Sequence, residues 1–205
     1  MEIYFEIADR VSRKDYGNPS SLHLAGVRAE AAVRTAAEQI AKTLKAEPAE
    51  LIFTSGGTES DNLAILGTAR SRKGYGRHLI TSAVEHPAVL EAMRFLEEQD
   101  FSVTVLPVDA AGKIALSDLE AAVRKDTILV SLMYVNNEIG AIQPVAAAAE
   151  LVHRLNPDCY FHTDAVQAYG KFEIYPKRLG IDMMSVSSHK IEGPKGVGFL
   201  YKNRR

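Results

Sequence analysis

The chain has 205 residues, of which 46% are hydrophobic and 24% charged, and its formal net charge is -2. This composition is typical of a globular protein of one domain or two small ones, and it argues against nucleic-acid binding, which needs a basic surface. No apolar run is long enough to span a membrane and no secretory signal opens the chain. With a single cysteine, Cys159, there is no internal disulfide. We therefore expect a cytoplasmic protein without a membrane partner.

Residues 1–16 carry no motif and form an N-terminal segment in our prediction, whereas 17–205 show no linker that would mark a second domain. Residues 17–21 read as a loop in which Ser20 or Ser21 caps a helix over about 26–44, and Pro48 ends that helix. The pattern then predicts strands at 51–54, 78–81, 101–106, 127–133, 159–163, about 183–186 and 197–201, with helices at 63–70, 88–98, 116–124 and 144–155.

This alternation predicts an α/β fold, a three-layer α/β/α arrangement with a mainly parallel sheet and a last antiparallel strand at 197–201. Ligands of such sheets bind at the carboxyl ends of the strands. Five polar clusters follow predicted strands, at 55–62, 85–86, 136–137, 164–167 and 187–190. Their coincidence predicts one binding site at that edge.

The cluster at 55–62, Ser-Gly-Gly-Thr-Glu-Ser-Asp-Asn, lies between a strand and a helix. Free N–H groups and the helix dipole favour a phosphate there, and the glycines let the backbone approach it. The alternative is an ordinary capped turn. The sequence is neither a Walker A loop nor GxGxxG.

The cluster at 187–190 brings Lys190 to the mouth of the sheet, where we expect it to be partly buried. A lysine that loses water there becomes a nucleophilic amine able to form a Schiff base. The alternative is a surface lysine in a turn. Together with His86, Asn137 and Asp164, this lysine suits a pyridoxal 5'-phosphate (PLP) site, because an acid beside the ring nitrogen makes the ring an electron sink.

Each of these residues also has a simpler interpretation. Asp164 could cap a helix, His86 could be a surface histidine, Asn137 could brace a turn and Gln167 could face solvent. Metal binding by His162, Asp164 and His189 is a further alternative, but no close HxxxH or CxxC pattern supports it, and we predict no metal.

The motifs resemble a known family. Residues 55–62, Glu85-His86, Val-Asn-Asn-Glu-Ile-Gly at 135–140, His-Thr-Asp-Ala-Val-Gln at 162–167, and Ser-Ser-His-Lys at 187–190 with Gly-Pro-Lys-Gly at 193–196 look like those of cysteine desulfurases. These are class V aminotransferases, which are fold-type I PLP enzymes. The resemblance runs from about residue 17 to about residue 201 and implies that 17–205 is a PLP-binding large domain.

The resemblance also implies residue roles, with Lys190 and His86 as the catalytic pair. Within the asparagine pair we prefer Asn137 to Asn136. The implied roles are Lys190 binding the aldehyde of PLP and carrying protons, Asp164 pairing with the pyridine nitrogen, Gln167 and Asn137 lying near the ring oxygen, His86 stacking on the ring, and Gly57, Thr58, Ser187 and His189 holding the phosphate.

The chain also departs from the family pattern. Members of the family are longer, and their Leu-Asp-x-Ala-Ala-Thr-Thr motif, small C-terminal domain, persulfide-forming cysteine and carboxylate-binding arginine have no counterpart here. Cys159 is predicted to lie in a buried strand as an inert core thiol. We therefore expect little or no sulfide release from cysteine by this chain alone.

For full-length relatives the resemblance implies conversion of L-cysteine to alanine by a homodimer. The sulfur passes to an enzyme cysteine and on to an acceptor protein, as in iron–sulfur cluster assembly. Two alternatives are open: a selenocysteine lyase or another class V aminotransferase fragment, and a non-catalytic module that binds PLP or a partner.

Overall fold

The computed structural model describes residues 2–204, with side chains from residue 6 onward. The chain divides into two compact units, Met1–Leu51 and Ile52–Arg205. The sequence showed no linker at this boundary, and the family-based division after residue 16 is a different one that stays a prediction. The first unit contains helices α1 (Glu2–Lys14) and α2 (Leu24–Leu44) and the short 3-10 helix η1 (Pro48–Glu50).

Helix α2 begins near its predicted position, but the predicted cap is wrong. His23, rather than Ser20 or Ser21, is the N-cap, and its Nδ1 accepts a hydrogen bond from the N–H of Gly26 at 3.2 Å. Gly26 has no room for a side chain, because a Cβ there would lie 2.2 Å from the carbonyl oxygen of Ser21. The loop before α2 therefore folds back on the first turn of the helix. With the loop in this position, the N-cap is His23, which follows both serines in the chain.

The second unit is built on a seven-stranded sheet in the order β1-β7-β6-β5-β4-β2-β3. Neighbouring strands from β3 to β6 are parallel, and β7 runs antiparallel to β6. This confirms the predicted α/β fold and its antiparallel last strand. The strands are β1 (Leu51–Thr54), β2 (His78–Ser82), β3 (Ser102–Leu106), β4 (Thr127–Ser131), β5 (Tyr160–Asp164), β6 (Met183–Ser187) and β7 (Gly198–Lys202).

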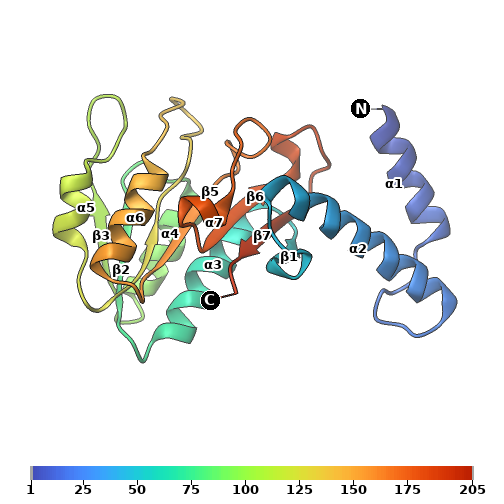
Figure 1. Ribbon diagram of the computed structural model, residues 1–205, viewed down its shortest axis with the longest axis horizontal. Helices are drawn as coiled ribbons and strands as arrows, with labels where there is room; N and C mark the ends of the chain where they lie inside the picture. The colour runs from blue at the N-terminus through green and yellow to red at the C-terminus, as the bar shows by residue number, and fades with distance from the viewer. Residues whose placement is uncertain (1, 205) are drawn as a thin grey trace. The chain divides into compact units, whose positions relative to one another are not determined.

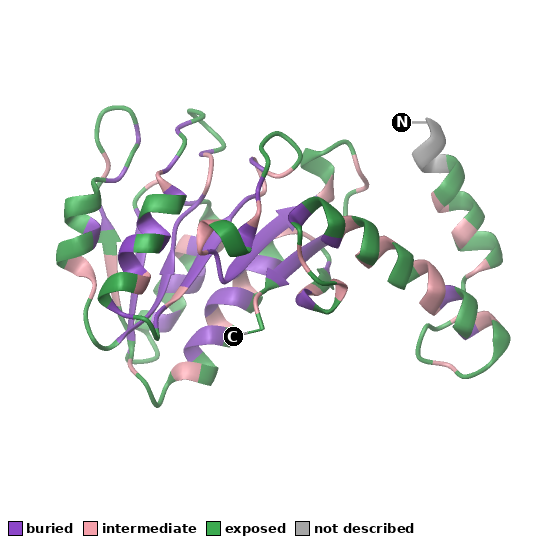
Figure 2. Ribbon diagram, viewed as in Figure 1, coloured by how far each residue is buried: buried purple, intermediate pink, exposed green. Residues whose placement is uncertain are grey.

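Helices cover both faces of this sheet (Figure 1). Helices α3 (Gly57–Arg72) and α4 (Pro87–Glu97) pack together on one face, and α5 (Leu116–Ala122), α6 (Val145–Leu155) and α7 (Pro176–Leu179) lie on the other. Every residue of β2, β4 and β6 is buried, which is the pattern of central strands covered on both sides (Figure 2). Within residues 2–204, no helix combines the length and the apolar character needed to cross a bilayer.

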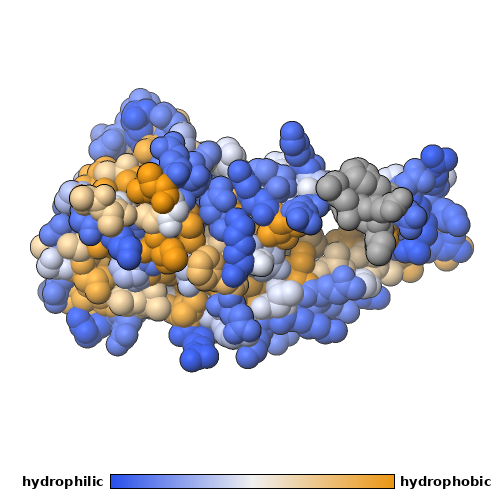
Figure 3. Space-filling model, turned by 90° about the horizontal axis from the view of Figure 1, so that it is seen from above, coloured by the Kyte–Doolittle hydropathy of each residue, from blue (hydrophilic) through white to orange (hydrophobic). Residues whose placement is uncertain are grey.

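The loops that follow β3, β4, β5 and β6 lie together at one edge of the sheet, the upper edge in Figure 1. This is the carboxyl edge, where the sequence places its polar clusters. Figure 3 looks onto the molecule from above and shows apolar side chains beside hydrophilic ones. The exposed large apolar residues of these loops are Ile139, Ile142, Phe172, Ile191 and Val197.

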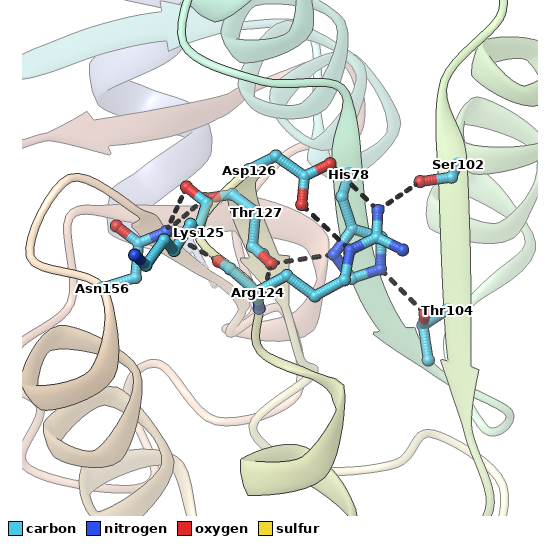
Figure 4. A network of polar contacts seen from close by, with 8 residues as sticks. All are labelled: His78, Ser102, Thr104, Arg124, Lys125, Asp126, Thr127 and Asn156. Atoms are coloured by element: carbon cyan, nitrogen blue, oxygen red, sulfur yellow. Dashed lines mark hydrogen bonds and ion pairs between the residues drawn. The ribbon is translucent and has the colours of Figure 1, made fainter.

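The opposite, amino edge of the sheet is fixed by a polar network (Figure 4). His78 at the start of β2 places its two ring nitrogens 2.8 Å from the hydroxyls of Thr127 and Thr104. Its pKa is lowered to about 4, first by burial and next by the positive charge of Arg124. A neutral imidazole thus joins β2 to both neighbouring strands, at the opposite end of β2 from the carboxyl-edge clusters.

The same network predicts that Asn156→Ala will destabilise the fold. Its Nδ2 donates to the carbonyl oxygens of Arg124, Lys125 and Thr127 at 3.0, 3.3 and 2.9 Å. Losing these bonds removes the amide donor from one buried carbonyl oxygen, that of Thr127, and from two partly buried ones, so we expect a loss of about 2–3 kcal/mol in the free energy of unfolding. Asn62→Ala is the control, since Asn62 donates to one helical carbonyl only. Equal losses for the two variants in urea titrations would contradict the prediction.

Candidate active site

A pocket of about 210 Å³ lies at the carboxyl edge of the sheet, within the second unit. All of the site residues predicted from the sequence line it, together with three residues that the prediction did not name. The predicted members are Gly57, Thr58, His86, Asn137, Asp164, Gln167, Ser187, His189 and Lys190, and the additional ones are Asp61, Met133 and Val166.

The N-terminus of α3 forms one wall of the pocket. The helix begins at Gly57, earlier than predicted, and no side chain caps its first N–H groups. A Cβ on Gly57 would lie 2.7 Å from Cγ2 of Val166, so only a glycine fits there without displacing that side chain. The preceding loop is held by Glu59, whose Oε2 accepts bonds from the N–H and hydroxyl of Ser55, both at 2.6 Å. Uncapped N–H groups and the helix dipole make this wall suitable for an anion.

A second cavity of about 320 Å³ continues from this wall. It shares Gly57, Thr58, Ser187 and His189 with the first pocket and adds Lys195, a cation that the sequence analysis quoted in a motif without giving it a role. The positive charge of Lys195 therefore lies on the same side as the uncapped helix end, where it complements an anionic group.

The end of β6 supplies the lysine and its neighbours. Ser187 is buried as the last residue of β6, and its hydroxyl lies 2.8 Å from Nδ1 of His189. Lys190 follows on a short 3-10 turn, η2 (Ser188–Lys190). The expected partial burial of Lys190 is wrong, because its side chain is exposed at the pocket rim. Strand β6 ends at the carboxyl edge of the sheet, and the 3-10 turn that follows it leaves the amine of Lys190 exposed to solvent.

His86 caps helix α4. Its Nδ1 accepts a hydrogen bond from the N–H of Ala88 at 3.1 Å, so a neutral ring carries its proton on Nε2. The side chain is exposed and lines the pocket. It is thus a surface loop histidine, as the simpler interpretation held, that also lines the pocket.

The structure separates the two asparagines that follow β4. Asn136 is buried: its Nδ2 donates to the carbonyl oxygen of Val84, and its Oδ1 accepts the N–H groups of Glu138 and Ile139. Asn137 is exposed and lines the pocket. Asn136 therefore braces the turn, and of the two asparagines Asn137 is the one that lines the pocket.

Asp164 ends β5 and is almost fully buried. Its Oδ1 accepts the N–H of Val166 at 2.9 Å, so it stabilises the following turn; the alternative that it caps a helix is wrong, because the next helix begins only at Pro176. Burial is the main cause that raises the pKa of its carboxyl. Gln167 is half-buried and lines the same pocket, and Lys171 donates to its Oε1 at 3.4 Å. Gln167 is therefore not simply a solvent-facing side chain.

Glu85 is a buried acid whose role the sequence analysis missed, although it belongs to a quoted motif. Its Oε1 accepts the hydroxyl of Ser82 at 2.6 Å and the N–H of Met133 at 2.9 Å, which ties the loop before His86 to the end of β4. Burial is the main cause that raises its pKa to about 8. A neutral Glu85 thus places His86 beside the strand ends.

Glu85→Gln should reveal this proton in the pH dependence of stability. Between pH 4.5 and about 8, Glu85 carries a proton in the folded state and not in the unfolded state. The stability that this proton contributes is therefore fully present below pH 4.5 and is lost as the pH rises through about 8. In urea titrations, the stability of wild type relative to Glu85→Gln should fall by about 1.4 kcal/mol per pH unit across this window. Parallel curves would show that Glu85 is ionised in the folded chain.

Two further predictions concern cysteine and metals. Cys159 is fully buried just before β5, which begins at Tyr160 rather than at Cys159, and its position agrees with an inert core thiol. His162 is also fully buried, 2.8 Å from the hydroxyl of Ser131 and 2.9 Å from that of Ser185. In the part of the chain that the structure describes, no group of three or more His, Cys, Asp or Glu residues is arranged to hold a metal ion.

A family model described as "Aminotransferase class-V" matches residues 6–205. The chain belongs to the class V aminotransferase family. It is 50% identical over 189 residues to the cysteine desulfurase IscS of Dictyoglomus turgidum. The aligned residues cover 92% of this chain and 48% of the relative. The chain thus spans about half the length of the curated relatives it matches.

Solved structures lead to the same family. A NifS-like protein superimposes with a TM-score of 0.96 and 40% identity, covering 100% of this chain and 56% of that one. A structure of SspA in complex with cysteine gives a TM-score of 0.94 and 40% identity, covering 98% of this chain and 58% of that one. The sheet and helices of this class V aminotransferase are therefore those of the NifS-like fold-type I enzymes.

Proposed function

We propose that this chain is the PLP-binding part of a cysteine desulfurase, an enzyme that takes sulfur from L-cysteine and leaves alanine. The observation that carries the proposal is the pocket at the carboxyl edge, where an amine, a carboxyl group, amides and an uncapped helix end meet. The family supports the same activity, since the relatives that match nearly the whole chain are cysteine desulfurases.

The residues present fit PLP chemically. Gly57 has no side chain to cover the start of α3, and a Cβ at this position would contact Val166. The uncapped N–H groups at this helix end suit a phosphate. Asp164 offers a carboxyl group inside the pocket, which suits a ring nitrogen that gains a proton. Lys190 offers an exposed primary amine, which suits an aldehyde. The anionic, basic and electrophilic parts of PLP each have a matching group.

In this proposal each side chain has a defined task. Bound PLP supplies an electron sink that stabilises negative charge on the α-carbon of an amino acid. Asp164 would hold the ring nitrogen, Asn137 and Gln167 would bind near the ring oxygen, and Thr58, Ser187 and His189 with the α3 N–H groups would hold the phosphate. The Nζ of Lys190 would bind the aldehyde and take or return a proton, and the imidazole of His86, with its proton on Nε2, would face the ring.

Covalent trapping tests the cofactor and the lysine together. The chain is incubated with PLP, reduced with borohydride, digested, and its peptides are mapped by mass spectrometry. The expected result is one labelled lysine, Lys190. Labelling at Lys195 or at scattered surface lysines, with Lys190 untouched, would refute the assignment of the site.

Substrate and partners form the finer part of the proposal. L-cysteine is the proposed substrate, and a change in the visible spectrum of the PLP-loaded chain with L-cysteine, larger than with L-selenocysteine or L-alanine, would support it. We further propose a homodimer and a sulfur-acceptor protein, since exposed apolar loops at the carboxyl edge offer surface for association. A monodisperse monomer in light scattering would contradict the dimer.

A further inference from the structure

Asp61 is a buried acid at the pocket that neither the sequence analysis nor the proposed function uses. It lies one turn into α3, is 1% exposed and lines the same pocket as Asp164. Its Oδ1 has no hydrogen-bond partner and lies 3.7 Å from Nε2 of His162. A buried carboxylate needs several hydrogen-bond donors, so leaving one of its oxygens without a partner costs folding free energy. The cost is much smaller when the carboxyl group is protonated and neutral.

The groups around Asp61 offer it little positive charge. From β5 it faces His162 and Asp164, and Glu85 approaches from the loop before α4. His162 is fully buried with its pKa lowered to about 3, so it is neutral at physiological pH. Among residues 2–204, neither lysine nor arginine forms an ion pair with any of these three acids. Three adjacent buried carboxylates without a cation would repel one another strongly.

One acid of this group has a separate reason to be ionised. In the proposed function Asp164 faces a protonated ring nitrogen, which would compensate one negative charge and no more. Asp164 also accepts a hydrogen bond from the N–H of Val166. The donor available to Asp61 is the hydroxyl of Ser185, which also lies within hydrogen-bond distance of His162. The carboxyl group with the poorer set of donors is therefore the one expected to keep its proton.

We propose that Asp61 is a positioning residue that stays protonated beneath the cofactor site, so that the pocket presents a single carboxylate, that of Asp164, to the ring. This inference rests on the proposed function. Burial and the neighbouring charge of Asp164, in that order, raise the pKa of Asp61 well above its usual range, which agrees with it. The neutral acid limits the charge of the pocket to the one that the ring nitrogen can balance.

The first experiment follows the proton without any cofactor. Free energies of unfolding are measured by urea titration between about pH 5 and pH 7 for wild type, Asp61→Asn and Asp118→Asn, an exposed carboxyl that serves as control. A protonated Asp61 makes the unfolding equilibrium constant of wild type rise tenfold per pH unit relative to Asp61→Asn. A pH-independent difference would overturn the proposal. If Asp61→Asn fails to fold, infrared spectroscopy of Glu85→Gln decides, because this variant lacks the other neutral acid: a protonated carboxyl band is expected, and its absence excludes a neutral Asp61.

The second experiment separates the roles of the two acids in binding. PLP dissociation constants are measured for wild type, Asp61→Asn and Asp164→Asn. Asp164→Asn should raise the constant at least ten times more than Asp61→Asn does, because only Asp164 carries the charge. Equal effects would overturn the inference about Asp61. Absence of PLP binding by wild type would instead refute the proposed function, and the pH-dependent stability would still report on the proton of Asp61.

Discussion

Lys190→Ala is expected to abolish both the visible absorption that PLP gives with the wild-type chain and the covalent label fixed by borohydride. Lys190 lines the pocket with an exposed amine, and the alanine variant has no nucleophile at that position. Lys190→Arg should lose the label as well, because a guanidinium stays protonated and does not form a Schiff base. The measurement is an absorption spectrum under saturating PLP, followed by peptide mapping of the reduced protein.

The control for this experiment is Lys113→Ala, in the exposed loop after β3. It removes a lysine of similar exposure that lies outside the pocket, so its absorption and labelling should match those of wild type. Undiminished absorption in Lys190→Ala would show that another amine holds the cofactor. Since Lys190 is exposed, its replacement should leave the free energy of unfolding within about 0.5 kcal/mol of wild type, which excludes misfolding as the cause.

Gly198→Ala is expected to cause a large loss of stability. Gly198 is the first residue of β7, and a Cβ there would lie 2.5 Å from the carbonyl oxygen of Val186 and 2.7 Å from Cα of Gly56. Both contacts are with backbone atoms, so no side-chain rotation relieves them. Either the pairing of β7 with β6 or the loop before α3 must shift, and we expect a loss of about 2–4 kcal/mol in the free energy of unfolding.

Gly67→Ala is the matched control for this substitution. Gly67 lies within α3, and a Cβ there would meet no atom within 4 Å. Alanine in a helix interior should raise the free energy of unfolding by about 0.5–1 kcal/mol. The two variants should therefore change stability in opposite directions, and Gly198→Ala should also weaken PLP binding by moving the anion-binding wall. A Gly198→Ala chain as stable as wild type would show that the strand absorbs the methyl group.

The sequence, with its resemblance to a known family, determined the class of fold and nine of the residues that line the pocket. Apolar runs such as that of β6 alternate with helical patterns, and this periodicity is a local property that can be read without knowing the partners of a strand. Polar clusters at the ends of predicted strands then gather at one edge, because parallel strands share their carboxyl ends. All of the predicted site residues accordingly line one pocket.

The tertiary structure decided what each residue does within that pocket. Asn136 and Asn137 are identical and adjacent, and Asn136 is the buried one because the carbonyl oxygen of Val84, distant in sequence, accepts its amide. The raised pKa of Glu85 likewise depends on its burial in the folded chain, which outweighs the N–H of Met133, a donor from the loop after β4 that favours the ionised form. In the sequence, Asp61 is an ordinary polar residue of a predicted helix. Only the folded chain places His162 and Asp164 of β5 beside it. Protonation and donor partners depend on burial and on groups brought together by folding, and neither is a property of the local sequence.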